Sequence, residues 1–252
     1  MAVVPSKATA TACAAEGAGT GATSDPAAVD VASLEVVSVE GDGRIAVSDG
    51  LVRAQLDAAR ALEARGARVR TAKVAGLSRS IEIWSAMLDA AGGPSFSELL
   101  GNGREIAAAR ELYRFAFGRS PHTLPAIALA LLEKVPKLIP EHGRRLVALG
   151  AKLKQELVEL IGPRGVMLYP SHTRPAPRHH RSMFPPWNWG YTAILNVVEL
   201  PVTQVPLGLD ADGVPLGVQV AAVHGNDHLS IAAALSLEDT FGGWVPPRLA
   251  RR

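Results

Sequence analysis

The stretch Leu200–Val220, LPVTQVPLGLDADGVPLGVQV, decides the predicted fold. Two apolar runs, Leu200–Leu209 and Leu216–Ala222, flank the turn dipeptide Asp212-Gly213, which predicts a strand, a turn and a second strand. The second run is continuously apolar, as in a strand covered on both faces. Downstream, apolar residues recur at helical spacing, so we expect a helix to close this unit.

The order of elements upstream predicts an α/β fold, with a mixed or mainly parallel sheet flanked by many helices. A strand, a helix and a second strand near the N-terminal end form a βαβ-like unit, which favours parallel pairing. The strand-like segments are Leu34–Val39, Arg44–Val47, Ala67–Val74 and Val166–Tyr169. The helical segments are Ser48–Arg65, Ser78–Ala91, Phe96–Leu100, Arg104–Phe117, Pro121–Val135, Glu141–Leu160 and Gly190–Val198.

The N-terminal residues differ in composition from the rest of the chain. Met1–Asp30 is rich in Ala, Thr, Gly and Ser, and such a segment buries too little apolar surface to offset its ordering entropy. We therefore expect residues 1–33 to be disordered, and treat a fusion of unrelated coding sequence as a hypothesis for them. Residues 34–252 are expected to form the folded part.

Composition excludes several classes of protein. The net charge is +2, and the sequence has no long basic block, which argues against nucleic-acid binding. The one cysteine, Cys13, rules out an internal disulfide framework. No apolar run approaches the roughly 20 residues that span a bilayer, and no secretory signal is evident. We expect a cytoplasmic protein that uses no cofactor.

Several segments, in this order, also resemble the C-terminal half of the amidase signature family, most of all its fatty-acid amide hydrolase branch. They are IEIWSAML from Ile81, SPHTLPAIALALLEK from Ser120, GVMLYPSHTRPAPRHH from Gly165, WNWGYTAILN from Trp187 and NDHLSIAAALSLE from Asn226. The resemblance also takes in the opening stretch and covers about Arg44 to Pro247. It implies the amidase-signature fold without its N-terminal catalytic half, and hydrolysis of acyl amides and other linear carboxamides.

That family performs acyl transfer with a serine nucleophile, a second serine and a lysine base, with both serines on a Gly-Ser-Ser-Gly-Gly-Ser segment. The Gly/Ser segments here, Gly17–Ser24, Gly76–Ser80 and Gly92–Ser97, lack that order. No catalytic residue is therefore assigned, and we expect the chain to be inactive alone. Two functions stay open: an amidase that works with a catalytic half, or a non-catalytic fragment or pseudoenzyme that binds hydrophobic ligands or a partner chain.

In the resembled family the C-terminal half helps to line the substrate channel. The aromatic turn before the predicted helix Gly190–Val198, together with that helix, is where we place this wall; plain core packing is the alternative. Aromatic and flexible apolar groups suit an acyl chain, and polar groups can orient an amide. The predicted substrate-binding residues are Met183, Phe184, Trp187, Tyr191, Thr192 and Asn196. The expected partners are an acyl amide or another hydrophobic small molecule, a second copy, or a catalytic half.

Histidines and glutamines raise further hypotheses. At His172, His179 and His180 a metal site is disfavoured, because adjacent histidines on an extended backbone point in opposite directions and no acidic residue or cysteine lies near. We expect the side chains of His172, His179 and His180 to fix the loop. We expect the group His224, Asp227 and His228 to be a helix cap and surface histidines. The amides of Gln204 and Gln219 are expected to be buried and to satisfy neighbouring backbone groups.

The segment Pro121–Val135 carries one more hypothesis. Some resembled enzymes dock on membranes through an apolar helix pair near the channel mouth. Here the apolar residues of that segment can lie in the membrane interface with two lysines among the headgroups, although core packing is the preferred alternative. The residues concerned are Leu124, Ile127, Leu131, Leu132, Lys134 and Lys137.

Overall fold

The computed structural model describes residues 24–92, 94–132, 140–177 and 188–246. Within these ranges the chain has the predicted α/β fold, with a five-stranded mixed sheet in the order β2-β1-β3-β5-β4. β1 pairs in parallel with β2 and β3, whereas β5 is antiparallel to both of its neighbours. The strands are β1 (Glu35–Ser38), β2 (Arg68–Thr71), β3 (Gly165–Tyr169), β4 (Val202–Leu209) and β5 (Pro215–Ala222).

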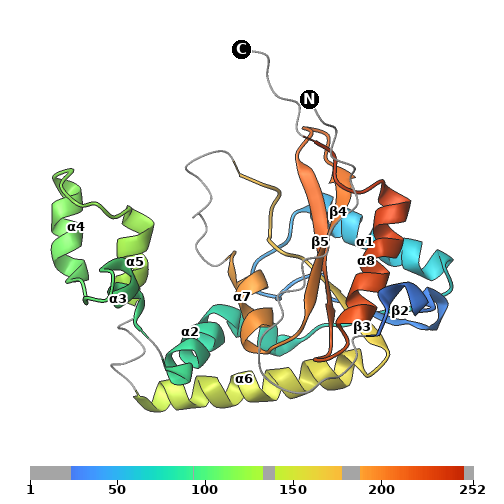
Figure 1. The fold of residues 1–252 in the computed structure, drawn as a ribbon, viewed down its shortest axis with the longest axis horizontal. Helices are drawn as coiled ribbons and strands as arrows, with labels where there is room; N and C mark the ends of the chain where they lie inside the picture. Colours follow the sequence, from blue (N-terminus) through green and yellow to red (C-terminus); the bar gives the residue numbers. More distant parts are fainter. Residues whose placement is uncertain (1–23, 93, 133–139, 178–187, 247–252) are drawn as a thin grey trace.

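Helices lie on both faces of this sheet, and three of them form a group that stands apart from it (Figure 1). The α-helices are α1 (Asp49–Ala64), α2 (Ser80–Ala91), α3 (Phe96–Leu100), α4 (Ala108–Ala116), α5 (Leu124–Leu132), α6 (Pro140–Ile161), α7 (Gly190–Val197) and α8 (Asp227–Phe241). Three short 3-10 turns add η1 (Pro26–Ala28), η2 (Val31–Ser33) and η3 (Ala75–Arg79).

One core lies between the sheet and the helices α1 and α8. It forms because alternate residues of the central strands point to this face, while apolar residues at helical spacing point inward from both helices. Its members include Val36, Leu62, Leu168, Val220 and Leu237, all almost fully buried. Val205 of β4 also lies here, so this face is covered as far as the edge of the sheet.

A second core lies on the opposite face, under α2, α6 and α7. It contains Met167, Tyr169, Leu157, Ile194 and others. The cover stops short of the β4–β5 corner, where the side chains of β4 that point to this face are exposed or half-buried. This uncovered corner becomes important for the site below.

β4 is an edge strand in the part of the chain that the structure describes, and its proline fits that position. Ala222 donates its N–H to Pro201 O (3.0 Å). Because bonded and non-bonded pairs alternate in an antiparallel ladder, position 206 turns its backbone nitrogen away from β5. Pro206 therefore costs the ladder no hydrogen bond, as expected for proline on an edge.

The β-type run expected at Arg44–Val47 is wrong, because no strand forms there. The carboxylate of Asp42 accepts the backbone N–H groups of Arg44 (2.8 Å) and Ile45 (3.0 Å). An aspartate that binds backbone two and three residues ahead favours a turn over a strand.

Two helices begin later than the sequence indicates. α4 starts at Ala108 instead of Arg104, and α5 starts at Leu124 instead of Pro121. Ser120 uses its hydroxyl locally, accepting from His122 N (3.1 Å) and donating to Glu111 (2.8 Å). The segment before α5 is therefore a hydrogen-bonded loop and not a first helical turn.

The disorder expected up to residue 33 does not hold for residues 24–33. Asp25 and Asp30 each accept a backbone N–H two residues ahead, and these bonds begin η1 and η2. Val29 and Val31 then pack against the core shared by α1 and α8. Residues 1–23 lie outside the described part of the chain.

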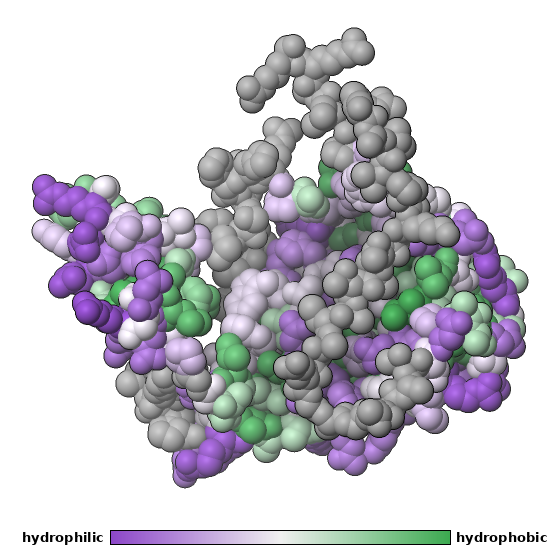
Figure 2. Space-filling view, in the orientation of Figure 1, coloured by the Kyte–Doolittle hydropathy of each residue, from purple (hydrophilic) through white to green (hydrophobic). Residues whose placement is uncertain are grey.

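The separate group formed by α3, α4 and α5 has a mixed surface. Figure 2 shows apolar surface on the side of this group that faces the rest of the molecule, and hydrophilic surface on its outer side. In the described ranges, no helix is both long enough and apolar enough to cross a membrane.

The corner between α7 and β4 is closed by a residue in an unusual conformation. Leu200 donates its N–H to Leu195 O, and Glu199 donates to Asn196 O, each at 3.1 Å. This pair of hydrogen bonds ends a helix whose next residue adopts the left-handed conformation, which favours glycine. Here that residue is Glu199, with φ at +56°, and its carboxylate pairs with Lys154.

We predict that Glu199→Gly stabilises the chain relative to Glu199→Ala by about 1 kcal/mol, because glycine has no Cβ to strain the left-handed backbone. Both variants lose the ion pair with Lys154, so their difference isolates the backbone effect. Urea denaturation of the two variants measures it. Equal midpoints would contradict the assignment of strain to position 199.

Candidate functional site

The helix α7 carries the described part of the predicted wall. Tyr191, Thr192 and Asn196 all lie on it, and its Ile194 and Leu195 are buried in the second core. Met183, Phe184 and Trp187 lie outside the described residues. The described part of the site therefore consists of α7 and of the residues that hold this helix in place.

Tyr191 anchors α7 to the turn that follows β1. Its hydroxyl accepts the N–H of Asp42 (3.1 Å) and lies 3.0 Å from the Asp42 carboxylate, to which it can donate. The ring stacks on Tyr169 with centroids 5.1 Å apart. Only 1% of Tyr191 is exposed, and this burial raises the pKa of its phenol well above the ordinary value. Tyr191 thus positions the helix from the core side and does not face its open side.

Three further contacts fix the first turn of α7. The amide nitrogen of Gln219 donates to Tyr191 O (3.2 Å) and to Pro170 O (2.9 Å), which ties α7 to β5 and to the end of β3. Trp189 meets Trp84 of α2 edge to face, with centroids 4.6 Å apart. A Cβ at Gly190 would lie 3.0 Å from Ile81, so glycine permits this close approach of α7 to α2.

The opposite side of α7 presents polar groups. Thr192 and Asn196 are exposed and lie one helical turn apart. The Thr192 hydroxyl donates to Trp189 O (3.1 Å) and keeps its acceptor capacity. Together they place a hydroxyl and a carboxamide on the exposed face of α7, while the opposite face of this helix is fixed by its contacts with the core.

The loop Ser171–Pro177 follows β3 and is fixed to the elements around it. Thr173 is fully buried; its carbonyl accepts from Ser48 N (2.8 Å), and its hydroxyl donates to Asn188 Oδ1 (2.7 Å). His172 accepts from Arg174 N through Nδ1 (3.1 Å), so this imidazole shapes the loop as expected. His179 and His180 lie outside the described residues.

Among the described residues, no group of three His, Cys, Asp or Glu side chains is arranged to hold a metal ion. At the start of α8, Asp227 is the first helical residue, while the side chain of Asn226 donates to Pro163 O (2.8 Å) and makes no cap bond.

Gln204 and Gln219 face each other as register partners across β4 and β5, yet they differ in burial. Gln219 is 4% exposed and satisfies two backbone carbonyls, which confirms the expectation for it. The expectation for Gln204 is wrong: this residue is exposed, because α7 covers the sheet over Gln219 but does not reach the edge strand.

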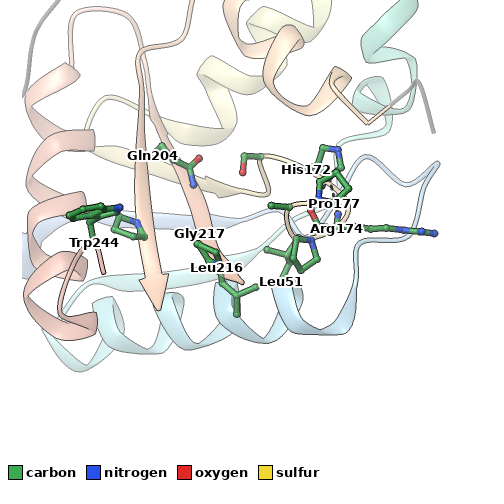
Figure 3. Close-up of a pocket in the computed structure, with 13 residues that line it drawn as sticks. Leu51, His172, Arg174, Pro177, Gln204, Leu216, Gly217 and Trp244 are labelled. Atoms are coloured by element: carbon green, nitrogen blue, oxygen red, sulfur yellow. Dashed lines mark hydrogen bonds between the residues drawn. The ribbon is translucent and has the colours of Figure 1, made fainter. Parts of the chain in front are cut away.

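A pocket of about 510 Å³ opens beside Gln204, between the loop that follows β3 and the β4–β5 corner (Figure 3). Of the predicted wall residues that the structure describes, Tyr191, Thr192 and Asn196, none lines it. The sequence signal that could have found it is the concentration of proline in Ser171–Pro177 and on both strands of the hairpin. The pocket is lined by Leu51, Ser171, His172, Arg174, Pro175, Ala176, Pro177, Gln204, Pro206, Pro215, Leu216, Gly217 and Trp244.

The sequence of this chain is similar to that of a known protein family. A family model described as Amidase matches residues 12–230. Human fatty-acid amide hydrolase 2 is 43% identical over 188 residues, which cover 72% of this chain and 35% of that protein. Zebrafish (Danio rerio) fatty-acid amide hydrolase 2-B is 41% identical over 230 residues, covering 87% of this chain and 43% of that protein. The chain thus spans less than half the length of these relatives.

Solved structures agree at the level of the fold. A bacterial aryl acylamidase of the amidase signature family superimposes with a TM-score of 0.60 at 15% identity, covering 83% of this chain and 44% of that one. A 6-aminohexanoate cyclic dimer hydrolase complexed with substrate gives 0.56 at 22% identity, covering 89% and 51%.

The family match begins at residue 12, upstream of the start near Arg44 that the sequence motifs indicate. It covers most of the chain. The chain belongs to the amidase family.

Proposed function

We propose that this chain supplies the substrate-facing, non-catalytic part of an acyl-amide hydrolase. The observation that carries the proposal is α7, whose Tyr191 side is locked into the core while Thr192 and Asn196 remain exposed. Met183, Phe184 and Trp187 precede this helix and complete the proposed wall. The names of the relatives support a fatty-acid amide as substrate.

In this role the chain binds the substrate and orients it, and does not break the amide bond. The hydroxyl of Thr192 and the carboxamide of Asn196 can hold the polar amide, and aromatic side chains can receive the acyl chain. The nucleophilic serine and the second serine would come from a segment of the Gly-Ser-Ser-Gly-Gly-Ser type, an order that these 252 residues lack, and the lysine base would come from the same catalytic half. We propose that the chain alone hydrolyses no amide.

A second candidate is a non-catalytic binding protein or pseudoenzyme. The edge strand β4 favours it, because Val202 and Leu209 are exposed and alternate backbone groups of β4 point away from β5. Such an edge can pair with a partner chain or with a second copy of the chain. The activity test below separates the two candidates.

The first prediction concerns catalysis. The chain alone should leave a fluorogenic long-chain acyl amide uncleaved, whereas mixing it with a separately expressed catalytic half of a fatty-acid amide hydrolase should restore cleavage. Replacing the nucleophilic serine of that half by alanine is the control. Cleavage by the chain alone, or none after mixing, would contradict the proposal.

The second prediction separates the two sides of α7. Tyr191→Phe leaves the buried Asp42 N–H without its acceptor and should lower the free energy of unfolding by about 1–3 kcal/mol. Thr192→Val should change stability by less than about 0.5 kcal/mol, since the residue is exposed. In the reconstituted enzyme Thr192→Val should raise KM for the acyl amide.

Thr240→Val is the matched control, since Thr240 also donates from a helix surface to a backbone carbonyl in its own helix, Ser236 O (3.0 Å). An unchanged KM for Thr192→Val, or an equal rise in KM for Thr192→Val and Thr240→Val, would exclude α7 from the substrate-binding wall.

Membrane contact through Pro121–Val135 stays a proposal: Leu124 of α5 is exposed, but a larger exposed apolar group lies on α4. Ile127 of α5 is fully buried. On α4 the pattern is inverted, because Glu111 is only 4% exposed and bonds to Ser120 and Arg114, contacts that lower its pKa. The apolar residues of this helix and the next turn are exposed instead. They are Leu112, Tyr113, Phe115 and Phe117.

We propose that this exposed face of α4 rests on a membrane surface while the protein stays on the cytoplasmic side. The double variant Tyr113→Ser, Phe117→Ser should abolish flotation with phosphatidylcholine–phosphatidylserine vesicles and keep the melting temperature. Leu235→Ser, an exposed leucine on α8, is the control. Equal flotation of the double variant and the native chain would exclude α4 as the contact.

A further inference from the structure

The loop that joins α4 to α5 is fastened to α4 by the hydroxyl of Ser120. α4 ends at Ala116 and α5 begins at Leu124, in the group of helices that stands apart from the sheet (Figure 1). The Ser120 hydroxyl accepts the N–H of His122 (3.1 Å) and donates to Glu111 Oε2 (2.8 Å). Glu111 is only 4% exposed, so this bond reaches the buried side of α4.

The partner of Ser120 is a charged group. The hydrogen bond from Ser120 and the contacts with Arg114 lower the pKa of Glu111, so its carboxyl group is ionised at neutral pH. Arg114 donates to the other carboxylate oxygen, Oε1, at 2.9 Å. The carboxylate can stay at this position because one side receives a hydroxyl proton and the other a guanidinium. An anionic group in place of the hydroxyl would remove the donor and add repulsion.

The sequence around Ser120 makes the same hydroxyl a target for an enzyme. In these 252 residues, Ser120 is the one serine or threonine that directly precedes a proline. Proline disfavours helical backbone at the residue before it and favours an extended conformation, which presents the serine hydroxyl to an active site. Arg119 and Pro121 are exposed on either side of the half-buried Ser120, so an enzyme can reach this segment from outside.

We propose that Ser120 is a phosphorylation site for a proline-directed protein kinase. In the reaction, Ser120 Oγ attacks the γ-phosphorus of Mg²⁺-bound ATP, an aspartate of the kinase accepts the hydroxyl proton, and ADP leaves. The product is a phosphoserine that carries a charge of about −1.5 to −2 at neutral pH. Its ester oxygen has no proton to donate to Glu111.

Phosphorylation replaces an attraction by a repulsion at the contact between α4 and its loop. The phosphate would stand beside the carboxylate of Glu111, and two groups of the same sign repel each other strongly where water is scarce. Arg114, which pairs with Glu111, and Arg119, which precedes Ser120, are cations that the phosphate attracts. α4 packs on α5 in the unmodified chain, and we expect the phosphate to loosen this contact.

This site does not depend on the proposed function. A kinase acts on Ser120 whether or not the chain contributes to amide hydrolysis or touches a membrane. The modification would, however, act on the helix whose apolar residues are exposed, Leu112 and Tyr113 among them, and so would alter the surface that the vesicle experiment examines.

The site is tested by treating the full chain with an active mitogen-activated protein kinase and ATP, followed by peptide mass spectrometry. Phosphate should appear on Ser120 and be lost in Ser120→Ala. Pro121→Ala should slow the reaction at least about tenfold, because this class of kinase selects proline after the serine. Ser78→Ala is the matched control: Ser78 is also half-buried and donates to Ala75 O (2.7 Å), but Arg79 follows it.

Hydrogen exchange measures the effect on α4. The phosphorylated chain should exchange the backbone amides of α4 at least about tenfold faster than the unmodified chain, because a buried hydrogen bond to a charged group is lost and repulsion is added. Ser120→Ala loses the bond without gaining charge, so its exchange should lie between these two. In Glu111→Gln the phosphate meets a neutral amide, so phosphorylation should accelerate exchange less than in the native chain.

Three results would overturn the proposal. Ser120 stays unmodified under conditions in which a control Ser-Pro peptide is phosphorylated; or the phosphorylated chain exchanges the amides of α4 as slowly as the unmodified chain; or the phosphate accelerates exchange equally in the native chain and in Glu111→Gln. None of these readouts measures amide cleavage, so failure of this proposal is distinguishable from failure of the proposed function.

Discussion

The hydrogen bonds between Tyr191 and Asp42 join two segments that lie 149 residues apart, and the arrangement of the site depends on them. Asp42 sits in the turn after β1 and uses one carboxylate oxygen to organise that turn and to receive the phenol. Through Tyr191 the same carboxylate fixes the direction of α7, and therefore the face on which Thr192 and Asn196 lie. Such buried polar contacts contribute modestly when made but cost much when broken, so they favour one orientation of the helix strongly.

The two candidate sites share a structural cause, which is that the described helices cover one face of the sheet incompletely. α1 and α8 cover the first face out to β4, whereas α7 covers the second face only as far as β5. The open corner leaves Gln204 and Pro206 facing the pocket, and the helix that stops short of them exposes Thr192 and Asn196. Relatives of more than twice this length belong to the same family, so in them additional chain accompanies this part of the fold.

The fold could be predicted from the sequence because continuous apolar runs and helical spacing mark buried strands and helices. The errors arose where a side chain replaced a backbone contact: Asp42 turned the expected strand Arg44–Val47 into a loop, and Ser120 delayed the start of α5. The site was less predictable. Gln204 and Gln219 look alike in sequence and pair in register, and only the tertiary cover by α7 and the end of β3 distinguishes them. The role of Tyr191 likewise depends on a partner far away in the chain.

The central claim is that the open face of α7 contacts the substrate, and photo-crosslinking tests it most directly. The chain would be assembled with a catalytic half whose nucleophilic serine is replaced by alanine, and irradiated with a long-chain acyl amide that carries a diazirine beside the amide. Peptide mass spectrometry would then locate the label. We predict label on Thr192 or Asn196, removed by an excess of unmodified amide. Competable label confined to other parts of the chain would contradict it.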